Sequence, residues 1–125
     1  MAEVKREYHN GTLVAEWFEI NGIKEGEFKS YHENGQLQCI CNYVNGKQEG
    51  EFKSYHVNGQ LLLICNYVNG ELNGEFKMYY NTGQLMNNGN YVNDMEDGEY
   101  KRYYENGYIR EIVNYVNGIM LMIKK

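Results

Sequence analysis

The sequence contains no proline, and its apolar runs are short. The chain of 125 residues has 14 Gly and no Pro, so turns depend on Gly and Asn, and every residue of a strand keeps its backbone N–H. Apolar runs reach only five residues, as in Leu61 to Cys65, whereas a membrane-spanning helix needs ~20. The segment Met1 to Asn10 is polar, unlike the core of a signal peptide. These features predict a cytoplasmic protein.

Cysteine and positive charge are also scarce. The three cysteines lie within apolar segments and lack the spacing of metal ligands, which favours free, buried thiols in a reducing compartment. Lys and Arg number 12 against 17 Asp and Glu, a formal net charge of −5. This charge opposes non-specific attraction to nucleic acid and disfavours a membrane surface as partner. We expect no nucleic-acid partner, no metal and no cofactor.

Repetition is what the sequence has in abundance. Gly26, Gly50, Gly74 and Gly98 are spaced by 24 residues, and each begins the motif Gly-Glu-Phe/Tyr-Lys. No linker separates the repeats, so residues 1–125 form a single repeat domain. The predicted units are residues 2–25, 26–49, 50–73, 74–97 and 98–121, of which the first is degenerate, with a C-terminal cap at 119–125.

Each unit contains two turn signals, most of them Asn-Gly. Asn and Gly tolerate the positive φ that two-residue hairpin turns require. The predicted turn glycines are Gly35, Gly46, Gly59, Gly70, Gly83, Gly107 and Gly118. Turns at this spacing predict an all-β fold, an elongated single-layer antiparallel β-meander of five 24-residue hairpin repeats. It would have about ten strands, and each unit would pack only against its neighbours.

Alternation along the strands divides the side chains between two faces of this sheet. A two-residue turn at Asn34-Gly35 places His32 opposite Leu37 on one face and Tyr31 opposite Gln38 on the other. A four-residue loop with a different centre would change these pairs but not the alternation. The face predicted to form the core holds Phe52, Leu61, Leu63, Cys65, Tyr67, Phe76, Leu85, Tyr91, Tyr100, Ile109, Val113 and Tyr115.

The opposite face carries rows of Tyr, Lys and Glu and is the candidate interaction face. Tyr offers a large amphipathic contact area and is enriched at protein interfaces, although it equally suits a half-buried pleated surface. Each Lys follows a Glu two residues earlier, so mutual neutralisation is expected rather than a phosphate-binding row. The candidate residues are Tyr31, Tyr55, Tyr79, Tyr103, Lys29, Lys53, Lys77 and Lys101.

The sequence motifs do not assemble a catalytic set. His32 and His56 occupy positions where other units have Tyr80 and Tyr104, and this interchange indicates packing rather than catalysis. Neither His has a nucleophile and an acid within its own motif. We therefore predict a protein that is not an enzyme.

The run Ile119 to Ile123 is apolar and precedes two lysines. An exposed edge strand of this composition favours association. The segment either caps the ribbon by folding over the last hairpin or joins a second chain in a homodimer by strand addition, and the sequence leaves both outcomes open.

The motifs Gly-Glu-Phe-Lys-x-Tyr-His/Tyr-x-Asn-Gly-Gln-Leu and Asn-Tyr-Val-Asn-Gly resemble MORN repeats (membrane occupation and recognition nexus), in the divergent variant found in bacteria and giant viruses. The resemblance extends over Glu3 to Leu121. It implies a twisted β-meander that acts as a protein–protein interaction or scaffolding module with a protein partner. A membrane-associated scaffold and an antitoxin that binds a cognate toxin are the alternatives. A viral origin would place the protein in the host cytoplasm.

Overall fold

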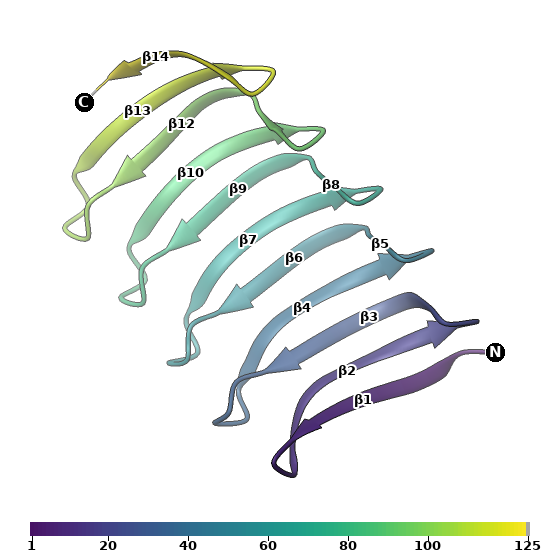
Figure 1. The fold of residues 1–125 in the computed structure, drawn as a ribbon. Helices are drawn as coiled ribbons and strands as arrows, with labels where there is room; N and C mark the ends of the chain where they lie inside the picture. Colours follow the sequence, from purple (N-terminus) through teal and green to yellow (C-terminus); the bar gives the residue numbers. More distant parts are fainter. Residues whose placement is uncertain (125) are drawn as a thin grey trace.

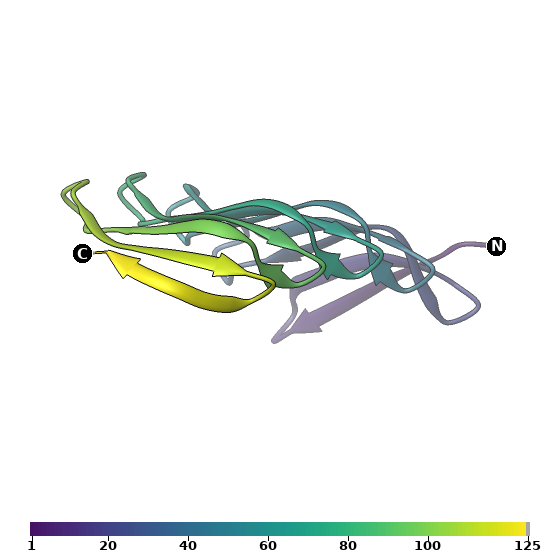
Figure 2. The same ribbon diagram turned by 90° about the horizontal axis from the view of Figure 1, so that it is seen from above.

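Residues 1–124 are described by a computed structural model, in which antiparallel strands follow one another along one sheet (Figure 1). The strands are β1 (Glu3–His9), β2 (Thr12–Ile20), β3 (Ile23–Tyr31), β4 (Leu37–Val44), β5 (Lys47–Gln48), β6 (Gly50–Tyr55), β7 (Leu61–Val68), β8 (Glu71–Leu72), β9 (Gly74–Tyr79), β10 (Leu85–Val92), β11 (Met95–Glu96), β12 (Gly98–Tyr103), β13 (Ile109–Val116) and β14 (Ile119–Lys124). Figure 2 shows one twisted layer with the two termini at opposite ends. The predicted all-β meander is confirmed.

The short strands β5, β8 and β11 exist because a glycine bulge interrupts each return strand. Gly50 has a φ of +88°, and the Glu49 N–H donates to the Asn42 carbonyl at 2.9 Å. Such a bulge requires a residue that adopts positive φ without steric cost, which explains the glycine at the head of Gly-Glu-Phe-Lys. The equivalent glycines have φ values of +91° at Gly26, +106° at Gly74 and +86° at Gly98.

One series of turns consists of two-residue hairpin loops. Asn45 and Gly46 have φ values of +51° and +81°, and Val44 pairs with Lys47 across them. Positive φ at both central residues defines the type I′ turn, whose twist matches that of paired strands. The same loop recurs at residues 10–11, 21–22, 69–70, 93–94 and 117–118.

The other series is a three-residue loop and not the two-residue turn expected from the sequence. The Gly35 N–H donates to the His32 carbonyl at 2.9 Å, and the His32 N–H donates to the Gln36 carbonyl at 2.8 Å. Gly35 has a φ of +87°, whereas Asn34 keeps a negative φ. This is a type I turn followed by a glycine bulge, the usual three-residue hairpin loop. It recurs at Gly59, Gly83 and Gly107.

The longer loop and an adjacent bulge shift the pairing at the hairpin tips. Tyr31 pairs with Leu37 rather than with Gln38, so the expected pairs Tyr31–Gln38 and His32–Leu37 are wrong. Cross-strand partners share a face, and the shift therefore moves one apolar residue per unit out of the predicted core. In the following units Leu61 pairs with Tyr55, Leu85 with Tyr79 and Ile109 with Tyr103.

The core lies on the face that holds Phe28, Cys41 and their repeat equivalents, here called the aromatic face. Its rings meet within each unit, as in Phe52 and Tyr67, whose centroids are 6.2 Å apart in an edge-to-face arrangement. Such pairs add about 0.5–1.5 kcal/mol beyond the area they bury. The face that holds Lys29, Ile40 and their equivalents is called the lysine face. The buried core residues are Ala15, Cys41, Cys65, Tyr100 and Val113.

The two edges of the sheet differ in chemistry. β1 at one edge is mostly exposed and charged, with Glu3, Lys5 and Arg6 along it. β14 at the other edge is exposed at every residue and pairs with β13. It thus extends the sheet in plane instead of folding over the last hairpin. Pairing of β14 with a second copy stays a prediction, which light scattering with and without residues 119–125 tests.

Candidate functional site

Backbone pairing aligns one residue from each strand in a row across the lysine face. Ile40 pairs with Lys29 on one side and Lys53 on the other, and Ile64 pairs with Lys53 and Lys77. From Lys29 to Lys77 the candidate lysines therefore alternate with isoleucines along the repeat axis, and Asn88 takes the isoleucine position between Lys77 and Lys101. The row from β1 to β14 is Arg6, Glu16, Lys29, Ile40, Lys53, Ile64, Lys77, Asn88, Lys101, Ile112 and Lys124.

Each candidate lysine forms an ion pair within its own strand, as alternation along the strand predicts. The lysine side chains are 33–37% exposed. Ion pairs at such partly exposed positions contribute ~0–1 kcal/mol to stability, and they neutralise the lysine row. The N–O distances are 3.4 Å for Lys29–Glu27, Lys53–Glu51 and Lys77–Glu75, and 3.3 Å for Lys101–Glu99.

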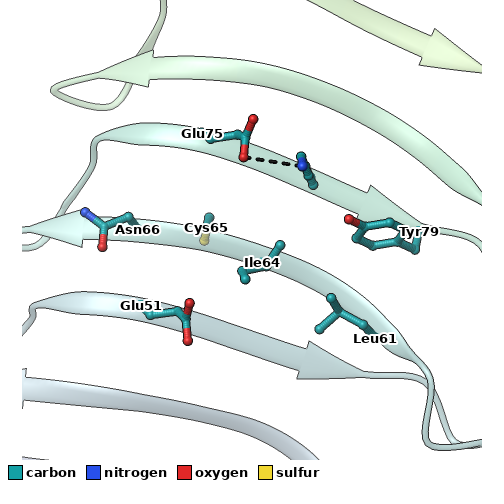
Figure 3. Close-up of a pocket in the computed structure, with 8 residues that line it drawn as sticks. Glu51, Leu61, Ile64, Cys65, Asn66, Glu75 and Tyr79 are labelled. Atoms are coloured by element: carbon teal, nitrogen blue, oxygen red, sulfur yellow. Dashed lines mark ion pairs between the residues drawn. The ribbon is translucent and has the colours of Figure 1, made fainter. Parts of the chain in front are cut away.

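An open hollow lies on the lysine face over β6, β7 and β9, and Figure 3 shows the residues that line it. Leu61 and Ile64 contribute apolar surface from the middle strand, while Tyr79 and Glu75 come from the next strand of the sheet. We call it the Ile64 hollow; its volume is about 310 Å³. Its lining residues are Glu51, Leu61, Ile64, Cys65, Asn66, Glu75, Lys77 and Tyr79.

A second hollow occupies the equivalent place one repeat earlier. We call it the Ile40 hollow; its volume is about 480 Å³. Every residue of the Ile64 hollow has a counterpart here 24 residues before it. Its lining residues are Glu27, Leu37, Ile40, Cys41, Asn42, Glu49, Gly50, Glu51, Lys53 and Tyr55. The hollow is thus a property of the repeat and not of one irregular loop.

The structure places the four candidate tyrosines along the hairpin tips of the lysine face, all half-buried. Tyr55 and Tyr79 line the two hollows beside Leu37 and Leu61. The sequence had placed the leucine position on the opposite face, so these apolar floors were missed. Leu61 nevertheless aligns with Ile109 in the repeat, which signals an apolar requirement at this position.

The histidines tie each hairpin tip to the next unit. Nε2 of His32 lies 2.8 Å from the Tyr55 carbonyl oxygen, and Nε2 of His56 lies 2.8 Å from that of Tyr79. Because a carbonyl accepts, Nε2 carries the proton in both rings. The Tyr80 hydroxyl makes the same bond to the next unit at 2.7 Å, in keeping with the packing role inferred from the His/Tyr interchange.

The thiols are poorly suited to nucleophilic chemistry. All three cysteines are free, and burial raises the pKa of both Cys41 and Cys65 from 9.0 to about 11. A thiol is reactive as its thiolate, and these two remain protonated at neutral pH. Within the described chain, no three His, Cys, Asp or Glu side chains gather as metal ligands would. Residues 1–124 also hold no helix with the length and apolar character needed to cross a bilayer.

Comparison with solved structures finds the GtfA/B complex bound to UDP and GlcNAc, at 15% sequence identity and a TM-score of 0.35. The likeness covers 89% of this chain and 22% of that chain, and at this level it carries no functional argument. No curated protein matches the chain.

A family model described as the MORN repeat variant matches residues 24–45, 48–69, 72–93 and 96–117. It recognises four repeats where the sequence periodicity indicated five units, and the hairpin of β1 and β2 lies outside the match. The four matched segments cover more than half of the chain, and the protein therefore belongs to the MORN repeat variant family.

Proposed function

We propose that the protein is a non-catalytic interaction module that binds a protein partner on its lysine face. The observation that supports this most directly is the hollow that recurs at the 24-residue period, with an apolar floor, a tyrosine wall and charged groups at its rim. Interfaces combine aromatic and apolar anchors with a polar periphery in this way. The aromatic face, by contrast, supplies the buried residues that hold the sheet together.

Several features favour binding over catalysis. A single-layer sheet offers open hollows in place of the enclosed cleft in which enzymes perturb acids and bases. His32 and His56 are engaged in bonds between units, and the buried thiols of Cys41 and Cys65 have raised pKa values. We expect the protein to bind its partner in the cytoplasm, because free thiols persist in a reducing compartment.

The test is affinity purification with the wild-type chain and with a variant in which Tyr55 and Tyr79 are changed to Ser. The matched control changes Tyr104 and Tyr108 to Ser, because both are exposed at a hairpin tip, at 51% and 74%. Each captured protein is retested as a purified component. We expect the first variant to lose the partner and the control to keep it, with unchanged circular dichroism in both.

Capture that is equal for all three proteins would remove the lysine face from consideration. Flotation with anionic vesicles at low salt is the parallel measurement, because an electrostatic lipid interaction is strongest there. If the protein binds these vesicles and captures no protein partner, the proposal is wrong and the protein has a membrane role instead.

A further inference from the structure

The geometry points to a polyproline II segment as the occupant of the lysine face, with apolar side chains three residues apart and basic residues between them. This inference rests on the proposed function, because it names the class of partner segment that the same surface binds. It follows from three properties of the hollows: their spacing, their walls and their charge.

The spacing of the hollows matches the pitch of a polyproline II helix. Equivalent hollows repeat every second strand of the continuous sheet path, and neighbouring strands lie ~4.8 Å apart, so the hollows lie ~9.6 Å apart. Polyproline II has three residues per turn and rises ~3.1 Å per residue, or ~9.3 Å per turn. A segment that crosses the strands therefore directs residues i and i+3 into successive hollows.

Other regular conformations fit the spacing less well. Three residues of a β-strand cover ~10 Å, but residues i and i+3 then point to opposite sides. An α-helix returns to the same side after seven residues and ~10.5 Å. This repeat exceeds the ~9.6 Å spacing of the hollows by ~1 Å, so successive side chains would move out of register with them. The helix diameter of ~10–12 Å also suits a wide groove better than two separate hollows. Polyproline II alone combines the distance with the direction.

The walls of the hollows suit a backbone of this kind. Leu61 and Ile64 provide apolar contact for one side chain, and Tyr79 stands beside them. Grooves that recognise polyproline II are lined by aromatic side chains. The polyproline II backbone makes no internal hydrogen bonds, so its carbonyls are free to accept from the Tyr79 hydroxyl and the Lys77 ammonium at the rim.

The charge of the Ile40 hollow calls for basic residues in the ligand. Glu27, Glu49 and Glu51 line it together with one cation, Lys53. Glu27 and Glu51 are ion-paired, whereas Glu49 accepts a hydrogen bond from the Asn69 N–H at 2.9 Å. Its carboxylate is thus a negative charge of the hollow that no lysine or arginine in the described part of the chain neutralises, on a chain whose formal net charge is −5. Lys or Arg at the positions between the apolar residues complements this rim.

The test is titration of the intact chain with a labelled peptide of three Pro-Lys-Leu triplets, followed by fluorescence anisotropy. A phase control has the same composition with its leucines adjacent, and a proline-free control is a helix-forming peptide with leucine every seventh residue. We expect the triplet peptide to bind at least about tenfold more tightly than either control. Its affinity should fall as salt rises, because the rim is charged.

Two protein variants use substitutions that the repeat itself contains. Ile64→Asn places on the lysine face the residue found 24 positions later at Asn88, and Leu63→Asn does the same on the aromatic face with Asn87. Both are therefore compatible with the sheet. We expect Ile64→Asn to weaken triplet binding about tenfold and Leu63→Asn to change it less than about twofold.

The outcomes separate this inference from the proposed function. Equal binding of the triplet peptide and the phase control, tighter binding of the helical peptide, or equal loss in both variants would overturn the polyproline II inference. If the variant with Tyr55 and Tyr79 changed to Ser still loses the protein partner, the proposed function holds although the polyproline II inference fails. If that variant retains the partner, the proposed function is itself wrong.

Discussion

Single residues on the aromatic face must match the ring that lies against them. Gly89 occupies the row position that holds Cys41, Cys65 and Val113 in other units. A Cβ at Gly89 would lie 2.2 Å from Cδ2 of Tyr100, which is shorter than a van der Waals contact between two carbon atoms. Tyr100 takes the position that holds Phe in the three preceding units. The absence of a side chain at Gly89 leaves room for its ring, which is buried in the core.

Gly89→Ala should therefore destabilise the protein by about 1–3 kcal/mol, the usual cost of overpacking a core. The sign is informative, because Gly→Ala at a site with ordinary φ and free space usually stabilises by ~0.4–1 kcal/mol. Asn88→Ala on the lysine face of the same strand is the control, with an expected change within ~0.5 kcal/mol. Urea unfolding measures both, and a Gly89→Ala protein as stable as wild type would contradict the packing described.

Alkaline pH should weaken the fold through the buried acids of the aromatic face. Burial raises the pKa of the Cys41 and Cys65 thiols from 9.0 to about 11 and that of Tyr91 to about 12. A raised folded-state pKa stabilises below the unfolded-state pKa, and that stabilisation is lost as pH rises through the folded value. The urea midpoint should therefore fall between pH 9 and pH 11.

The double variant Cys41→Ala and Cys65→Ala should flatten this fall, because it removes both buried thiols. Unfolding curves at a series of pH values provide the measurement. A midpoint that rises over this interval, or a slope unaffected by the double variant, would show that the thiols are not desolvated.

At the scale of the element, two kinds of hairpin loop alternate from β3 onward, although most loops of both kinds carry Asn-Gly. Asn69 in the two-residue loop has a φ of +53°, whereas Asn58 in the three-residue loop keeps a negative φ and its Oδ1 accepts from the Gln60 N–H at 3.0 Å. Thr82 takes the Asn58 position one unit later. A β-branched residue avoids positive φ, so its presence there distinguishes the loops.

Asn69→Thr should cost about 1–2 kcal/mol, since it forces a β-branched residue into the left-handed region. Asn58→Thr should cost less than half as much, because Thr82 already occupies the equivalent position. Thermal unfolding of the two variants provides the comparison. Equal losses would mean that the two loops share one conformation.

The sequence predicts the strands and their order but not the conformation of these loops. The 24-residue period and the turn residues suffice for the meander and for the strand centres, where Lys29 lies opposite Ile40, the pair that symmetric counting outward from Asn34-Gly35 gives. Asn-Gly is compatible with both loop types, and the choice between them shifts every residue near the tip by one. Leu61 consequently changed faces, and with it the floor of the hollow.

The candidate tyrosines and lysines share a face by alternation alone, and the sequence was sufficient to group them. The hollows also depend on the pairing between units, as between Ile64 and Lys77. A glycine bulge at Gly74 displaces that register from the one a simple turn would give. Such bulges are difficult to place from a sequence read without its coordinates.

At the scale of the whole molecule, each unit contacts only its neighbours, and the chain behaves as a one-dimensional array. Deletion of residues 50–73 joins Glu49 to Gly74 and restores the motif that normally follows Glu49. We expect this variant to remain soluble and to unfold cooperatively, with an m-value lower by about a fifth.

Deletion of residues 50–61 is the control. It removes β6 and one hairpin tip and leaves Leu62 where the bulge glycine belongs. This protein should lose cooperative unfolding. If both deletions behave alike, the period is not the structural unit.

Side chains from successive units form one row across the lysine face, in which each isoleucine lies between two lysines. Nuclear Overhauser effects from the methyl groups of Ile40 and Ile64 test it directly. The structure predicts contacts from Ile40 to the side chains of Lys29 and Lys53, and from Ile64 to those of Lys53 and Lys77. Contacts from these methyl groups to the rings of Phe28 or Phe52 would place the isoleucines on the aromatic face and contradict this arrangement.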